Sequence, residues 1–194
     1  EMTLTKFFKG MSQNSIAQTF HDGHKAWDIV SEQKGLIRGY GTPLCAPENL
    51  RIEWIIGDSF TPESHVNLER GYGVWCTGLE TGLKYVFWHI LPVLPVNGGD
   101  IIKRGQIVAW MGNAGLVRSG GVYVPLEKRT IEPYEGTHLH IQIFTKEHSI
   151  GKWKGDEVDP KDLMNWNWEP QYTLIDLLGA MAKTLKKSLQ IINN

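Results

Sequence analysis

The chain has 194 residues, which is long enough to bury the core of one domain of ordinary size. Hydrophobic residues make up 41% of it and charged residues 21%, a globular composition that excludes wholesale disorder. A formal net charge of −1 gives no electrostatic basis for binding nucleic acid or an anionic membrane. We therefore expect no nucleic-acid partner and no stable membrane insertion.

Glycine and proline are spread through the chain in a way that predicts many short strands. There are 21 glycines and 9 prolines, and such punctuation suits turns between strands better than long helices. A lead-in over residues 1–20 should end in a polar strand. Three further strands are expected at Leu50–Ile56, Gly73–Gly78 and Lys84–Ile90, because each run is rich in β-branched and aromatic residues. Residues 100–112 predict a turn, a strand and another turn.

The first residues with clear chemistry are His24 and Asp28. They are four apart, so they share one face of a strand and also one face of a helix, and Trp27 and Ile29 favour the strand. A histidine and an aspartate at this spacing are by themselves a weak signal. His21 is an alternative ligand, but its odd separation from Asp28 would place it on the opposite face of a strand.

The two cysteines, Cys45 and Cys76, are too few for a disulfide framework. Nothing in the sequence places them within reach of each other. A single bridge therefore stays open beside the favoured interpretation, which is two buried free thiols. His65 and His148 are expected at the surface.

The pair His138 and His140 is the most informative feature of the chain. Alternate residues of a strand share a face, so both imidazoles should point the same way, roughly 6.6 Å apart along the strand. Leu139 and Ile141 would then pack on the opposite face. One ring of such a pair can bind a metal while the other reaches a water on that metal. The pair is a much stronger signal of a metal site because it follows a histidine and an aspartate about a hundred residues upstream.

The end of the chain predicts an amphipathic helix. Apolar residues recur there at helical spacing, while the lysines lie mostly off that stripe. The stripe consists of Leu174, Leu177, Leu178, Met181, Leu185, Leu189 and Ile192. We expect a domain at 1–170 and a helix or linker at 171–194 that packs on the domain or connects to a neighbour. Binding to a membrane surface or to a calmodulin-like partner is a weaker alternative.

Taken in order, the motifs of the chain resemble those of the M23 family of zinc metallopeptidases, the LytM and lysostaphin type. The resemblance covers about residues 14–163. The matching residues are Gly23-His24 with Asp28, Gly41-Thr42-Pro43 with Ala46, Tyr85 to His89, Asp100 with Lys103, Gly105 and Gln106, Gly112-Asn113-Ala114-Gly115, His138-Leu139-His140, and Val158-Asp159-Pro160.

This resemblance implies a fold, a cofactor and a set of site residues. The fold would be mainly β and of the duplicated-hybrid-motif type. It would consist of an antiparallel sheet with an open groove, to which the C-terminal amphipathic helix is added. One Zn²⁺ would be bound by His24, Asp28 and His140, and His138 and His89 would be the catalytic residues beside the activated water. A hydrogen-bonded core histidine is the competing interpretation of His89.

The chain departs from the family at two kinds of position. Some relatives have a tyrosine shortly before the first ligand, where this chain has Gln18, Thr19 and Phe20. The connection over 116–137 is much longer than usual and shows little pattern, and 58–70 is a second insertion. Such a loop is either a groove wall that sets substrate choice or a tolerated surface insertion.

The resemblance implies a zinc endopeptidase that hydrolyses peptides of bacterial peptidoglycan, with histidine general acid–base catalysis. The alternative is a catalytically silent wall-binding, regulatory or virion structural module that keeps the fold. Either protein would act at the cell wall, in an extracellular, periplasmic or virion-associated location, from a bacterium or a phage. The first residues lack the apolar core of a signal peptide. The bond cleaved and the oligomeric state are left open.

Overall fold

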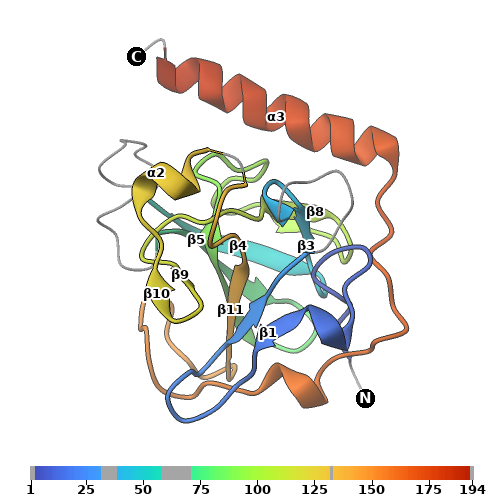
Figure 1. The fold of residues 1–194 in the computed structure, drawn as a ribbon. Coiled ribbons are helices and arrows are strands. Elements are labelled where there is room, and N and C mark those ends of the chain that lie inside the picture. Colours follow the sequence, from blue (N-terminus) through green and yellow to red (C-terminus); the bar gives the residue numbers. More distant parts are fainter. Residues whose placement is uncertain (1–2, 32–38, 58–70, 132, 193–194) are drawn as a thin grey trace.

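The computed structural model describes residues 3–31, 39–57, 71–131 and 133–192. Its main feature is a seven-stranded antiparallel sheet in the order β1-β2-β11-β6-β5-β4-β7 (Figure 1). The strands of this sheet are β1 Ile16–Gln18, β2 Trp27–Ile29, β4 Leu50–Ile56, β5 Tyr72–Gly78, β6 Lys84–Ile90, β7 Ile101–Ile102 and β11 Leu139–Phe144. Two small two-stranded sheets accompany it, formed by β3 Pro43–Cys45 with β8 Ile107–Trp110 and by β9 Arg118–Ser119 with β10 Val122–Tyr123. The expected mainly β, antiparallel fold is confirmed.

The predicted strands at the centre of the sheet are confirmed almost residue for residue. Leu50–Ile56 and Lys84–Ile90 have the expected bounds, and β5 begins one residue earlier than expected, at Tyr72. These runs could be predicted because they contain β-branched and aromatic residues that suit a pleated, buried surface.

The sheet buries a different set of side chains on each face. In β11, Leu139 and Ile141 are fully buried in the main core, where Phe7 and Phe87 meet edge to face with ring centroids 5.9 Å apart. The alternate residue His140 is only partly buried and faces the other way. Burying one such apolar side chain stabilises the fold by about 1.5–3 kcal/mol. The core face therefore fixes which face the histidines occupy.

The connection over 116–137 is more ordered than its lack of pattern suggested. It contains the β9–β10 hairpin and a short helix, α2 Leu126–Arg129. Gly120 and Gly121 both have positive φ, which a type I′ hairpin turn requires and which glycine adopts without strain. The prediction of a patternless connection was wrong, since this Gly-Gly pair was a local hairpin signal. The second insertion, 58–70, lies outside the described residues.

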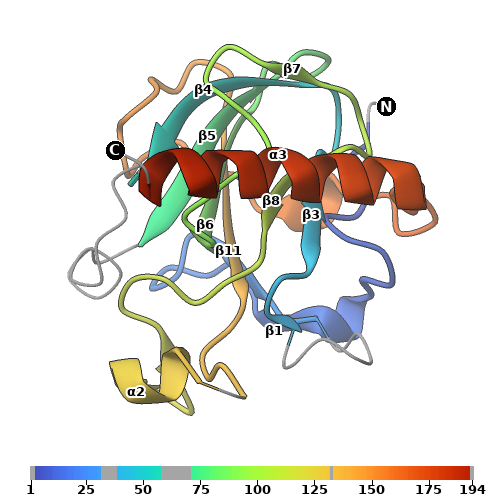
Figure 2. The same ribbon diagram turned by 90° about the horizontal axis from the view of Figure 1, so that it is seen from above.

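The C-terminal helix is confirmed as α3 Leu174–Ile192, which crosses the molecule beside β3 and β8 (Figures 1 and 2). Its packing face shares only Leu177 with the predicted stripe. Leu177 and Ala180 pack against a cluster that includes Trp110, and Trp110 Nε1 donates a 2.9 Å hydrogen bond to Thr184 Oγ1. Most of the predicted stripe is exposed, with Leu185 at 62%. None of the described helices is long and apolar enough to cross a membrane.

Two smaller predictions concern cysteine and histidine burial. Cys45 and Cys76 are both buried free thiols, as favoured, and burial raises the pKa of each. His148 is not at the surface: it is 4% exposed, and its ring stacks on Phe144 with centroids 4.1 Å apart. The ring lies against an aromatic cluster that includes Trp75, and this packing explains the burial. His65 lies outside the described residues.

Candidate metal and catalytic site

Strand register brings three predicted ligands together. β11 lies between β2 and β6, and His140 is directly opposite Asp28 in the β2–β11 pairing. His24 precedes β2 and is held there by a backbone bridge with His21. As a result, Asp28 Oδ1 lies 2.7 Å from His140 Nδ1 and 3.2 Å from His24 Nε2, and the two histidine nitrogens are 3.4 Å apart.

Two of the three distances between these atoms fit a tetrahedral zinc ion, while the 2.7 Å between Asp28 Oδ1 and His140 Nδ1 is a hydrogen-bond distance. Bonds of about 2.0–2.1 Å at tetrahedral angles place two ligand atoms about 3.3 Å apart. The distances of His24 Nε2 to the other two atoms, 3.2 and 3.4 Å, match that value. Two imidazole nitrogens and one carboxylate oxygen are also the donors that zinc takes in catalytic sites with an open fourth position. His24, Asp28 and His140 could therefore hold zinc.

The electrostatics of this group favour a bound cation. Burial opposes ionisation of Asp28, but hydrogen bonds with His140 and His24 outweigh it and hold the pKa of this carboxyl well below its usual range. For His24, the neighbouring Asp28 outweighs burial and raises the pKa of the imidazole. For His140, burial prevails and lowers the pKa despite the same carboxylate. An ionised carboxylate thus lies between two imidazoles at neutral pH.

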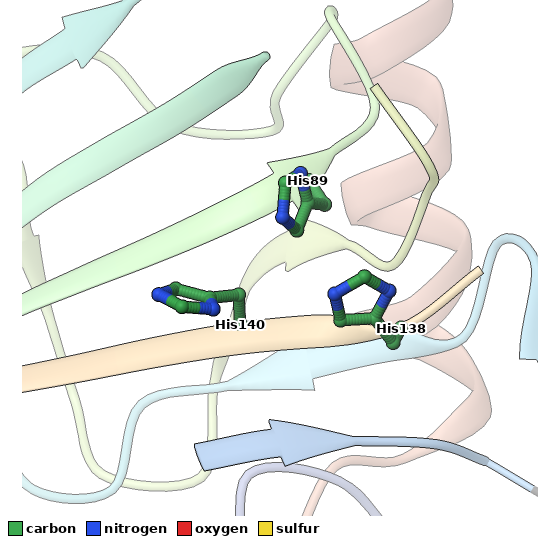
Figure 3. Close-up of side chains that lie close together, drawn as sticks. All are labelled: His89, His138 and His140. Atoms are coloured by element: carbon green, nitrogen blue, oxygen red, sulfur yellow. The ribbon is translucent and has the colours of Figure 1, made fainter. Parts of the chain in front are cut away.

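His138 and His89 lie on the other side of His140, as expected. His138 immediately precedes β11, and its ring points to the same side as that of His140, while His89 approaches from β6 (Figure 3). The ring centroids of His89 lie 4.6 Å from His138 and 5.7 Å from His140. All five predicted residues therefore converge. His89, His138 and His140 form a second group with ligand nitrogens within 4.8 Å of one another, but it lacks a carboxylate.

A bulge explains how His89 reaches this face. In the β5–β6 pairing Tyr72 is opposite Ile90 and Gly73 is opposite Trp88, which leaves His89 unpaired. His89 has φ 59°, an unusual backbone conformation for a residue other than glycine. Bulges of this kind re-aim a side chain beside a site. Without the bulge, strand alternation would point His89 away from Trp88, the residue opposite His140.

Backbone carbonyls orient three of the imidazoles. His24 Nδ1 lies 3.3 Å from Thr19 O, His89 Nδ1 lies 2.6 Å from Ala114 O, and His138 Nδ1 lies 2.8 Å from Gly136 O. A carbonyl only accepts hydrogen bonds, so each ring carries its proton on Nδ1 and leaves Nε2 as an acceptor when it is neutral.

The imidazole of His89 is held in its neutral form. Burial lowers its pKa well below the usual value, and the neighbouring His138 and His140 add to this effect. His138 has its Nε2 atom 3.8 Å from Asp28 Oδ1, so this atom faces the ligand group. The two rings thus differ in environment although both present Nε2 to the same space.

These residues lie in an open groove of about 1370 Å³. One side of the groove is formed by residues around His24, and another by the β9–β10 hairpin, including Arg118 and Tyr123. Trp88, Gln142 and Trp153 line it as well, and the sequence analysis did not identify them as site residues. The only signal for Trp88 was its position beside His89, and Gln142 follows His140 at strand spacing. The β9–β10 hairpin forms a groove wall, one of the two interpretations given to the long connection.

The structure also answers the question of the alternative ligand. His21 does not join the ligand group: its Nδ1 accepts a hydrogen bond from Gly23 N, and its Nε2 lies 3.2 Å from Gln18 Nε2.

No protein-family model matches the sequence, and no curated protein matches it significantly. Among solved structures, one from the identification and structural characterisation of LytU has a TM-score of 0.53 and 21% identity, and the match covers 81% of this chain and 88% of that one. The catalytic domain of the antimicrobial peptidase lysostaphin from Staphylococcus simulans has a TM-score of 0.47 and 21% identity, with 80% and 90% covered. A zinc-containing peptidase from Vibrio cholerae has a TM-score of 0.48 and 16% identity, with 81% and 39% covered.

The chain has the LytU fold. The likeness covers most of both chains and agrees with the mainly β, antiparallel arrangement expected from the motifs. At 21% identity, this likeness shows a shared backbone fold and nothing more. What the site does therefore has to be argued from its own residues.

Proposed function

We propose that this protein is a zinc-dependent endopeptidase of the M23 type that hydrolyses peptides of bacterial peptidoglycan. The observation that carries the proposal is the convergence of His24 Nε2, Asp28 Oδ1 and His140 Nδ1 within 3.4 Å of one another in a groove. We assign the zinc ion to these three side chains. Two further imidazoles lie beside them, and one of them can supply the proton transfer that peptide hydrolysis needs.

The chemistry divides between the cofactor and the chain. Zinc, when bound, lowers the pKa of a water molecule and polarises the scissile carbonyl. We assign general acid–base catalysis to His138, because its Nε2 atom faces the ligand group. His138 would take a proton from the attacking water and deliver it to the leaving amine.

His89 has a different role from His138. Its lowered pKa keeps the ring neutral, so Nε2 is a hydrogen-bond acceptor at neutral pH. We assign to it the orientation of the attacking water. Stabilisation of an oxyanion by a protonated His89 is disfavoured by the direction of this shift.

The substrate class rests on the groove and on the sequence motifs. The groove has a volume of about 1370 Å³ and is lined by residues of β1, β6, β11 and the β9–β10 hairpin, so it can take a peptide. The motif order of the sequence is that of peptidoglycan endopeptidases. A peptide of the cell wall is therefore the substrate that we propose, and a wall-facing location follows from it.

The test is zinc analysis of the purified protein paired with clearing of a cell-wall suspension. We expect about one zinc per chain, clearing that is lost on chelation, and loss of both zinc and clearing in His140→Ala. His138→Ala should keep its zinc and lose at least about 100-fold in rate. His21→Ala is the matched control, because this histidine is next to the site but outside the ligand group, and it should behave as the wild type.

Two outcomes would contradict the assignment. If His138→Ala loses its zinc, the roles of His138 and His140 are interchanged. If the wild type binds zinc tightly but hydrolyses no wall preparation, including walls with different cross-bridges, the protein is the silent binding module and not an enzyme.

A further inference from the structure

The two histidines outside the zinc group, His89 and His138, are oriented by carbonyls from one segment of the chain. Ala114 O bonds to His89 Nδ1, and Gly136 O bonds to His138 Nδ1. Both carbonyls lie at the ends of the connection that contains the β9–β10 hairpin and α2. The orientation of both rings therefore depends on what holds the two ends of this connection in place.

Buried polar side chains tie these ends together. Arg129, on α2, is 2% exposed, and its Nη1 atom donates hydrogen bonds to Asn113 O, at 3.2 Å, and to Gly115 O. These acceptors are the carbonyls on either side of Ala114. The Asn113 side chain is fully buried, and its Nδ2 atom donates at 3.0 Å to Arg129 O and to Glu135 O. Glu135 directly precedes Gly136.

The backbone at Ala114 is also confined by Gly71. Gly71, with φ 67°, lies so close that an added Cβ would be 2.3 Å from the Ala114 carbonyl carbon. Ala114 can therefore not move toward Gly71, and Arg129 holds the carbonyls of its two neighbours. A carbonyl confined in this way is a well-defined acceptor for the imidazole of His89.

We infer that Arg129, together with Asn113, is a positioning residue that fixes the ring orientation and Nδ1–H tautomer of His89 and His138. This inference rests on the proposed function, since it gives α2 a role in the same site. A guanidinium suits the position because it donates several hydrogen bonds from a rigid plane, which a lysine does not. Burying it is unfavourable unless it is hydrogen-bonded, and the bonds from Nη1 to the two carbonyls offset part of that cost.

The experiment compares zinc-loaded wild type, Arg129→Met, Arg129→Lys and the control Lys128→Met. Lys128 is exposed on the same helix, so its replacement removes a charge without touching the buried bonds. Three quantities are measured on each protein: zinc content, kcat and KM on a soluble peptide substrate, and ring ¹⁵N shifts of the histidines by NMR at pH 8, which identify the tautomer.

For Arg129→Met we expect one zinc per chain, a KM within about twofold of wild type and a kcat that is about 10–100-fold lower, the usual effect of removing an orienting partner. The His89 and His138 rings should change from a single Nδ1–H tautomer to a mixture. Arg129→Lys should restore part of kcat, and Lys128→Met should match wild type in every measurement.

Wild-type kcat and unchanged tautomers in Arg129→Met would overturn the inference. If Arg129→Met does not fold, Arg129→Lys decides, and wild-type kcat and tautomers there overturn it too. If the wild type hydrolyses nothing, the proposed function is refuted. The tautomer measurement then still tests by itself whether Arg129 positions the two rings. Loss of zinc in Arg129→Met would mean that Arg129 supports the ligand group and not the catalytic pair.

Discussion

The proposed ligand group and the proposed catalytic pair of this site are built in different ways. Asp28 and His140 occupy paired positions of two regular strands, so their approach follows from the register of the sheet. His89 and His138 depend on irregular backbone: a bulge with positive φ in one case, and carbonyls of a long connection in both. Asp28 and His140 should therefore be robust to changes in loops, whereas the catalytic pair should be sensitive to them.

The largest expected effect comes from the ligand group. Asp28→Ala should lose zinc and at least about 1000-fold in rate, because it removes a ligand and the charge between two imidazoles. His89→Ala should keep its zinc and lose about 100-fold. Zinc analysis and turnover of a soluble peptide measure both. Equal zinc loss in the two variants would show that the two parts of the site are not separate.

The next effect concerns the pH dependence of zinc binding. Asp28 raises the pKa of His24 in the metal-free protein, so zinc has to displace a proton from this ring. The dissociation constant for zinc should increase about tenfold per pH unit below the pKa of His24. Titration against a chromophoric chelator between pH 7.5 and 5 measures it. A constant affinity over that range would remove His24 from the ligands.

A smaller effect concerns the catalytic pair and folding stability. Burial lowers the pKa of His89, so the unfolded chain takes up the proton first as the pH falls through about 6.5. The contribution of this group is therefore fully present above that pH and is lost below it, by up to about 1.4 kcal/mol per pH unit.

Urea unfolding of zinc-free protein at pH 7.5, 6.5 and 5.5 measures this loss. His89→Asn is the comparison, because asparagine tolerates positive φ but does not titrate. The variant should lose less stability on acidification than the wild type. Parallel pH profiles would mean that His89 ionises in the folded protein as easily as in the unfolded chain.

The contrast between regular strands and irregular backbone also explains what could be predicted from the sequence. Strands with β-branched and aromatic residues and strictly alternating histidines follow general periodicities, so the central strands and the shared face of His138 and His140 were predictable. The site as a set of five residues needed the family resemblance in addition, because nothing local brings His24 to His140.

The other features of the site depend on tertiary contacts, which leave no periodic pattern in the sequence. A non-glycine bulge at His89 has no local signal, and neither does the buried bonding of Arg129, since arginine is ordinarily an exposed residue. His148 was expected at the surface, but an aromatic cluster buries it. Pattern identifies residues on regular strands more readily than those that support them from loops.

The last comparison concerns α3, where the helical pattern and the packing agree only in part. The predicted stripe contains both Leu177 and Leu185, but α3 packs through Leu177 and Ala180 and leaves Leu185 exposed. Leu177→Gln should lower the free energy of unfolding by about 1–2 kcal/mol, because it places an amide against an apolar cluster. Leu185→Gln, the matched change on the exposed side, should alter it by less than about 0.5 kcal/mol.

Urea unfolding at two protein concentrations completes this comparison. The free energies should be independent of concentration if the exposed stripe stays in water. A loss of more than about 1 kcal/mol for Leu185→Gln that grows with protein concentration would mean that a second copy covers the stripe. In that case the periodicity would describe an interface between chains and not the packing of α3 on its own domain, and pattern and packing would agree after all.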